Sequence, residues 1–306
     1  MTWKTLTLLL FVVLVAALSS CSSAPEQPAA PPPPPPKPDE PKWTATDGIA
    51  TPESVYVDVT GEIYTSQIDG MPDQKDGKGH IAKLNADGTV ANAMWATGFN
   101  APKGLRAANG TLWVADIDEV VGVDMATGMI KSHTKVPGAQ FLNDIDVAAD
   151  GTVYVSDTFA SKISTVKDGK VATFVSGPDF EYPNGLLLEG DHLVVGGWGK
   201  PEADFSTKVP GRIYTLNLMT KEKKLITPEP AGNFDGIESD GKGGYIVTDY
   251  NKGKLLSVSA TGEIKDIATF MPGTADLAYI AGQTLAIVPH MNENKIVAYN
   301  ISAALQ

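Results

Sequence analysis

The chain has 306 residues, a formal net charge of -12 and a single cysteine, Cys21. One cysteine excludes a disulfide within the chain, and the acidic balance disfavours a ligand with a phosphate backbone. We therefore expect no nucleic-acid partner.

Residues 1–20 have the layout of a bacterial lipoprotein signal peptide. Lys4 precedes an apolar run from Leu6 to Leu18, and small residues lead to Cys21. This run is shorter than the about 20 residues that a membrane-spanning helix needs. We predict lipidation of Cys21, for example with palmitate, which would hold the protein on a membrane. Because Ser22 follows the cysteine, we expect the periplasmic face of the outer membrane. The alternative is an ordinary signal peptide with an incidental cysteine.

Residues 21–42 are rich in proline, with an unbroken block at 31–36. A polyproline II segment rises ~3.1 Å per residue, so this stretch would reach at most roughly 65 Å. We interpret it as a tether between the cell envelope and a folded domain. Residues 43–306 contain no second linker and are numerous enough for one large domain.

The domain repeats a short phrase in which one variable residue stands before a turn and a strand-like run. The phrases occupy residues 52–55, 102–105, 142–145, 183–186, 234–237 and 274–277. Each is followed by Gly or Asp turns and by runs rich in Val, Ile, Tyr and Thr, which indicate four short antiparallel strands per repeat. Six such repeats predict an all-β fold, a six-bladed β-propeller.

The last repeat reaches the end of the chain before its fourth strand. Residues 43–49 belong to no repeat and precede the first phrase. We predict that they supply the missing strand, which would close the ring and leave no free sheet edge.

The variable position of each phrase should face the mouth of the central channel. These positions hold Glu53, Lys103, Asn143, Asn184, Asp235 and Ala275. Carboxylates and carboxamides offer hard oxygen ligands, which favours Ca²⁺, then Mg²⁺ or Mn²⁺, and places Zn²⁺ last. We predict Glu53, Asn184 and Asp235 as metal ligands. The alternative for any single phrase is a plain turn.

Two further residues have less specific patterns. Trp198, within a glycine-rich segment, is a candidate pocket wall or a core residue. His290 ends a strand-like run next to the expected channel.

Several phrases together resemble the gluconolactonase and regucalcin-type (senescence marker protein) family, in a bacterial lipoprotein form. They are Trp43 with Asp47-Gly48, residues 51–54, 143–145, 183–186, 235–237 and 275–277, and Val288-Pro289. The resemblance covers residues 43–301. It implies a six-bladed propeller and a divalent metal, usually calcium, held by Glu53, Asn184 and Asp235.

The resemblance also implies a reaction, hydrolysis of a lactone or related ester, with Asp235 as the catalytic residue. Asn143, Lys103 and Trp198 are the candidate substrate-binding residues. Animal members carry an Arg where this chain has Phe141, which disfavours a sugar-acid lactone. We expect a monomer that acts on a small molecule. The alternative is a non-catalytic, metal-stabilised scaffold at the cell envelope.

Overall fold

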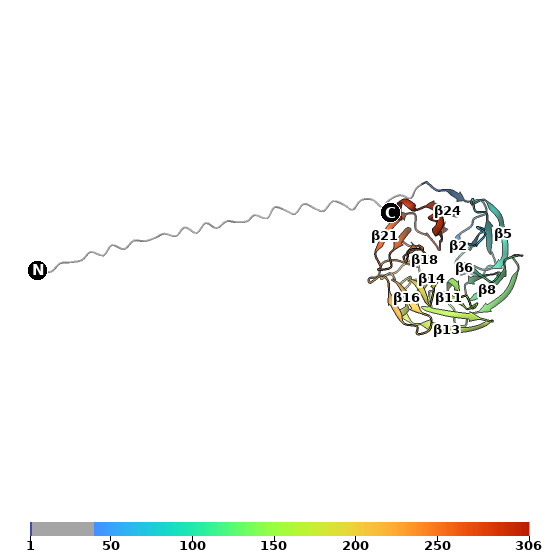
Figure 1. Cartoon of the computed structure of the whole chain (residues 1–306). Coiled ribbons are helices and arrows are strands. Elements are labelled where there is room, and N and C mark those ends of the chain that lie inside the picture. Colours follow the sequence, from blue (N-terminus) through green and yellow to red (C-terminus); the bar gives the residue numbers. More distant parts are fainter. Residues whose placement is uncertain (2–39, 306) are drawn as a thin grey trace. The chain divides into compact units, whose positions relative to one another are not determined.

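The computed structural model describes Met1 and residues 40–305, and these form an all-β structure of six four-stranded antiparallel sheets. The sheets are the blades of a six-bladed β-propeller, which confirms the predicted fold (Figure 1). The predicted signal peptide, the predicted lipidation site Cys21 and most of the predicted tether lie outside the described residues. Within the described part of the chain, no helix has the length and apolar character needed to cross a membrane.

Each of the first three blades is built from four consecutive strands, with the first strand innermost. Blade 1 contains β2 (Pro52–Val57), β3 (Ile63–Gln67), β4 (Gly79–Leu84) and β5 (Val90–Phe99). Blade 2 contains β6 (Pro102–Ala108), β7 (Thr111–Asp116), β8 (Glu119–Asp124) and β9 (Ile130–Lys135). Blade 3 contains β10 (Leu142–Val147), β11 (Val153–Asp157), β12 (Lys162–Lys167) and β13 (Lys170–Ser176).

Blades 4 and 5 follow the same order, and blade 6 takes its outer strand from the start of the domain. Blade 4 contains β14 (Pro183–Glu189), β15 (His192–Gly197), β16 (Ile213–Asn217) and β17 (Lys223–Leu225). Blade 5 contains β18 (Phe234–Ser239), β19 (Tyr245–Asp249), β20 (Lys254–Val258) and β21 (Ile264–Thr269). Blade 6 contains β22 (Ala278–Ile280), β23 (Leu285–His290), β24 (Lys295–Asn300) and β1 (Trp43–Ala45). The short 3-10 helices are η1 (Pro178–Phe180), η2 (Ala281–Gln283), η3 (Met291–Glu293) and η4 (Ser302–Leu305).

The hydrophobic core lies between neighbouring blades. In one cluster, Tyr64 and Ile81 of blade 1 pack against Leu105 and Val114 of blade 2. Strand residues alternate between the two faces of a sheet, so each blade contributes apolar side chains to both of its neighbours. Six apolar clusters, one between each pair of neighbouring blades, therefore stabilise the ring. If the ring were open, a free sheet edge would expose the apolar surface of one cluster.

The N-terminal strand closes the ring, as predicted. Strand β1 pairs antiparallel with β24, with Trp43 opposite Ala298 and Ala45 opposite Ile296. The strand is shorter than the expected 43–49, because the chain turns after Ala45, where the amide of Ile49 donates to the carbonyl of Thr46. Ile49 still packs into the core between blades 1 and 6.

The innermost strands share one irregularity near their beginnings. In β2, Pro52 pairs with Gln67 but the next pair is Val55 with Thr65, so β2 has one extra residue. The same shift follows the first residue of β6, β10, β14 and β18. A bulge leaves the extra residue outside the ladder and re-aims its side chain. Figure 1 shows β2, β6, β14 and β18 around the centre of the ring.

Candidate functional site

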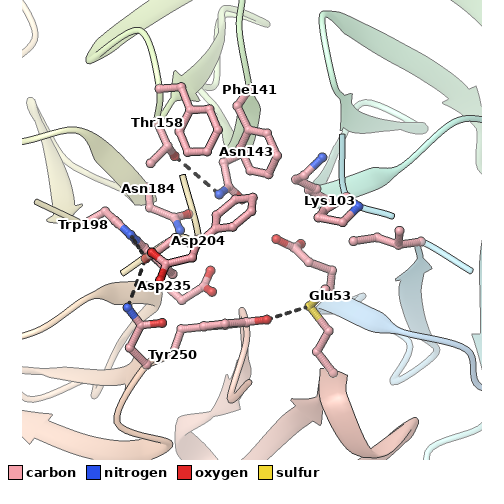
Figure 2. A pocket seen from close by; sticks show the side chains of 16 residues that line it. Glu53, Lys103, Phe141, Asn143, Thr158, Asn184, Trp198, Asp204, Asp235 and Tyr250 are labelled. Atoms are coloured by element: carbon pink, nitrogen blue, oxygen red, sulfur yellow. Dashed lines mark hydrogen bonds between the residues drawn. The ribbon is translucent and has the colours of Figure 1, made fainter. Parts of the chain in front are cut away.

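A cavity of about 180 Å³ opens at one mouth of the central channel. Five of the six variable positions line it, each as the second residue of its innermost strand. They are Glu53, Lys103, Asn143, Asn184 and Asp235. Figure 2 shows these side chains reaching the cavity from different blades. Ala275 is fully buried ahead of β22 and does not line the cavity. The repeat therefore predicts which innermost-strand residues line this cavity, and their functional roles stay predictions.

Carboxylates at the ends of the second strands hold the segments that lead into the bulges. The Asp157 carboxylate accepts the backbone amides of Gln140 at 2.9 Å and Phe141 at 3.0 Å, just before Asn143. Asp116 accepts two backbone amides in the same way in blade 2. Charge-assisted hydrogen bonds of this kind are strong, so the functional side chains start from a fixed backbone.

Three oxygen-bearing side chains in the cavity have polar atoms without protein partners. Glu53, Asn184 and Asp235 are 5%, 1% and 3% exposed. Glu53 Oε2, Asp235 Oδ1 and both polar atoms of Asn184 make no hydrogen bond. Buried polar groups are normally satisfied, so such a group of atoms points to a missing ligand. A hard divalent cation fits the donor set, because it accepts carboxylate and carboxamide oxygens.

The two carboxylates also require positive charge. Burial raises the pKa of Glu53 well above its ordinary value, and the negative charge of Asp235 adds to this effect. Burial also raises the pKa of Asp235 well above its ordinary value, and Asp276 adds to it. The neighbouring Asn184 amide lowers that pKa, although it forms no hydrogen bond of normal geometry. A cation between these groups would favour their ionised forms.

Lys103 is the only basic side chain among the described residues that line the cavity. It is 1% exposed, and its Nζ donates to the carbonyl of Ala101 at 3.0 Å. The same Nζ lies 4.4 Å from the centre of the Phe141 ring. Burial lowers the pKa of Lys103 to about 8, and Glu53 opposes that change. One ammonium cannot balance the charge of both carboxylates when they are ionised, so a bound cation would favour that ionised state.

The two other predicted substrate-binding residues also line the cavity. The Asn143 amide nitrogen donates to Thr158 Oγ1 at 3.4 Å, which leaves its carbonyl oxygen available to a ligand. Trp198 is 5% exposed and forms part of the wall, with its ring centre 5.6 Å from that of Tyr250. Its Nε1 donates to the backbone carbonyl of Phe205 at 3.2 Å. Trp198 is thus both well packed and part of the pocket.

A second ring of residues lines the cavity, and only its Trp198 was predicted. It consists of the residues that directly follow five of the second strands. They are Ile68, Thr158, Trp198, Tyr250 and Met291. The signal was present in the sequence, because the second strands were predicted and the position after each strand could have been compared. Phe159 and Phe205, which lie close to this ring, also line the cavity.

His290 does not line the cavity, although it ends β23. It is 2% exposed, its Nε2 lies 3.1 Å from the hydroxyl of Tyr299, and its ring meets Phe270 edge-on. Burial lowers the pKa of His290 to about 4. His290 is therefore a neutral packing residue at neutral pH.

Further along the channel, the innermost strands carry a separate ionic cluster. Arg106 Nη1 lies 2.9 Å from Glu238, and Arg106 Nε lies 3.8 Å from Asp146. Each of these residues stands three positions after a residue that lines the cavity. Arg106 and Glu238 reach the opposite mouth of the channel. The ion pair of Arg106 with Glu238 joins blades 2 and 5 across the channel.

Known proteins match this chain through structure alone. No family model matches the sequence, and no curated protein matches it significantly. A catalytically inactive variant of virginiamycin B lyase from Staphylococcus aureus, solved with quinupristin, superposes with a TM-score of 0.58 at 13% identity, covering 84% of this chain and 97% of that one. A streptogramin B lyase gives 0.55 at 16% identity, covering 82% and 83%.

The chain shares the β-propeller fold of these proteins. A third neighbour is the extracellular domain of a hybrid two-component system from B. thetaiotaomicron, with a TM-score of 0.52 at 15% identity, covering 82% of this chain and 34% of that one. At such low sequence identity, structural similarity shows the fold alone, and the function has to be argued from the residues of the site.

Proposed function

We propose that this chain is a divalent-metal-dependent hydrolase that acts on a lactone or related ester at the mouth of its channel. One observation carries the proposal. Glu53, Asn184 and Asp235 converge on one cavity with buried oxygen atoms that have no protein partner. The resemblance of the repeated phrases to gluconolactonases and regucalcin-type proteins supports the same function.

Glu53, Asn184 and Asp235 would hold the cation through their oxygen atoms. We propose Ca²⁺, with Mg²⁺ or Mn²⁺ as alternatives and Zn²⁺ as the least suited, because the set contains neither imidazole nor thiolate. When bound, such a cation supplies Lewis-acid polarisation of a carbonyl oxygen. The roles of the remaining side chains follow from their positions in the cavity.

Asp235 is the proposed general base. Its carboxylate orients a water molecule and accepts a proton as the water oxygen bonds to the carbonyl carbon. The carbon–oxygen bond of the ester then breaks, and the leaving oxygen takes up the proton. Asn143 Oδ1 is free to accept a hydrogen bond from the attacking water, since its amide nitrogen is held by Thr158. Lys103 places positive charge beside the reacting carbonyl, and Trp198 forms the wall.

Lyase chemistry is the other reaction class that the structural neighbours suggest. The inactive lyase variant has a histidine replaced by alanine. Among the described residues of this chain, no histidine lines the cavity. Hydrolysis is therefore the better fit here. Turnover in ¹⁸O-labelled water separates the two classes, because only hydrolysis places the label in the product acid.

The test is a panel of aliphatic, aromatic and sugar lactones and esters, assayed with calcium and with a chelator. We expect turnover that chelation abolishes and that Asp235→Ala lowers by at least about a hundredfold, as loss of a general base does. Asp168→Asn, on an exposed turn, is the matched control. Equal rates for the wild type and Asp235→Ala would refute the assignment. Calcium binding without turnover would favour the scaffold alternative.

We also propose that the protein is a monomer held at the outer membrane, on its periplasmic face, through lipid on Cys21 and the proline-rich tether. The arrangement of Lys4, the apolar run and Cys21 supports this. Growth with a labelled palmitate analogue should label the wild type and leave Cys21→Ser unlabelled. Labelling of both proteins, or of neither, would contradict the proposal.

A further inference from the structure

Three phenylalanine rings form one wall of the cavity. The centres of Phe141 and Phe159 lie 4.8 Å apart in a stacked arrangement. Phe205 completes the triangle, 5.2 Å from Phe159 and 5.5 Å from Phe141. All three line the same cavity as the oxygen ligands. Figure 2 shows aromatic rings on the side of Phe141 and Thr158, and Glu53 and Asp235 facing the cavity from other blades.

Phe205 reaches this wall from a long loop. Residues 198–212 join β15 to β16, whereas two to four residues join the second and third strands of blades 2, 3, 5 and 6. The corresponding connection of blade 1, residues 68–78, is also long and brings Ile68 and Pro72 to the cavity. The two extended connections thus belong to blades on opposite sides of the ring, and both contribute residues to the lining of this cavity.

The backbone of Phe205 is fixed in a conformation that a non-glycine residue seldom adopts. Its φ is 63°, in the left-handed region. Its carbonyl oxygen accepts hydrogen bonds from Trp198 Nε1 and from Asn251 Nδ2, each at 3.2 Å. Unfavourable backbone conformations persist where the surrounding contacts impose them, and they concentrate at ligand sites. Two neighbouring blades therefore hold the ring of Phe205 against the other two phenylalanines.

The three rings form one apolar face of the cavity, with Thr158, Asp204 and the ammonium of Lys103 beside them. Glu53, Asn184 and Asp235 provide the oxygen atoms, and the three rings offer no hydrogen-bond donor or acceptor. A polyhydroxylated ring placed against them would bury hydroxyl groups without partners, which is unfavourable. Packing an alkyl or aryl group against these rings would instead be favourable, because apolar surface on both sides would be removed from water.

We propose that Phe141, Phe159 and Phe205 form a subsite for the apolar substituent of the substrate. The substrate class is then a lactone or ester that carries an aliphatic or aromatic group, which we expect to be preferred over a sugar lactone. This inference rests on the proposed function for the reaction, but the binding that it describes does not require turnover.

Two matched ligand series test the subsite. The first is γ-butyrolactone, γ-hexanolactone, γ-octanolactone and γ-decalactone, assayed by kcat/KM together with glucono-δ-lactone. The second is 2-propyl-, 2-butyl- and 2-pentylcyclopentanone, which resemble lactones but have no bond to hydrolyse, assayed by calorimetric Kd. We expect affinity and kcat/KM to rise about fourfold per added methylene until the subsite is full.

The variants Phe205→Ala and Phe159→Leu should flatten this dependence. We expect the pentyl compound to lose about tenfold in affinity in Phe205→Ala, and the propyl compound to lose less. Phe180→Ala, a partly buried ring outside the cavity, controls for a general loss of stability and should keep the wild-type slope.

Three results would overturn the proposed subsite. They are affinity that does not depend on chain length in the wild type, an unchanged slope in both variants, and a preference for glucono-δ-lactone. Ketone binding with the expected slope but no lactone turnover would support the subsite and refute the hydrolase. Turnover without the slope would refute the subsite alone.

Discussion

Calcium should stabilise the folded protein by an amount that follows from the unpartnered oxygens. Glu53 Oε2, Asn184 Oδ1 and Asp235 Oδ1 are buried without hydrogen bonds. Each unsatisfied atom costs about 1–3 kcal/mol. A cation that satisfies all three should therefore add at least about 3 kcal/mol to the free energy of unfolding. For a domain of this size that corresponds to a rise in Tm of about 6–12 °C.

The assay is thermal unfolding of the folded domain in EDTA and in increasing calcium. By linkage, a stabilisation of about 3 kcal/mol requires free calcium at about 150 times Kd, so the titration must extend well above Kd. The Tm should then continue to rise with the logarithm of calcium concentration.

The variant Asp235→Asn tests whether the stabilisation comes from a cation bound at this cavity. The substitution keeps the size of the side chain and removes a charge that raises the pKa of Glu53. In EDTA the variant should have a higher Tm than the wild type. Adding calcium should then raise the Tm of the variant very little above its value in EDTA. Asp168→Asn, on an exposed turn, should behave like the wild type. Equal wild-type Tm values in EDTA and in saturating calcium would refute the reasoning.

Three further predictions concern the rest of the fold. Deletion of residues 43–50 should lower the free energy of unfolding by about 3 kcal/mol or more, since it removes β1 and buried Ile49; an unchanged Tm would contradict ring closure. Because the pKa of His290 falls from 6.5 to about 4 on folding, the unfolded state binds the extra proton. Stability should therefore fall by about 3 kcal/mol more in the wild type than in His290→Gln between pH 7 and pH 4, as measured by urea unfolding. An equal loss of stability in the wild type and in His290→Gln would show that His290 does not cause this pH dependence. Arg106→Met should lower the free energy of unfolding by about 3–5 kcal/mol, because it leaves buried carboxylates without their cation. Adding Glu238→Leu should restore most of this loss. If denaturant titrations show that the two losses simply add, the ion pair of Arg106 with Glu238 is not coupled as proposed.

The repeat in the sequence was sufficient to predict the fold and the five cavity-lining residues of the innermost strands. Each phrase has the same length and is followed by the same strand pattern, so the second residue of each innermost strand could be aligned across blades. Glu53, Asn184 and Asp235 do converge on one cavity, with Lys103 and Asn143 beside them. Their proposed roles as ligands, base and binding residues stay predictions.

The aromatic wall could not be predicted in the same way. Phe205 lies in an extended loop that has no counterpart in most blades, so periodicity gave no indication of where it would fold. Its position depends on hydrogen bonds to Trp198, at the start of the same loop, and to Asn251, which belongs to the next blade. Likewise, the pairing of Arg106 with Glu238 joins blades 2 and 5 across the channel, a contact that only the closed ring creates.

The bulges at the starts of β2, β6, β10, β14 and β18 bear on how such a protein can evolve. Each bulged residue lies outside the ladder pairs on either side of it, so its side chain can change without altering strand register. Glu, Lys, Asn and Asp already occupy this position on equivalent backbones. Single substitutions at the mouth of such a propeller can therefore change the chemistry of the cavity while strand register and blade packing stay the same.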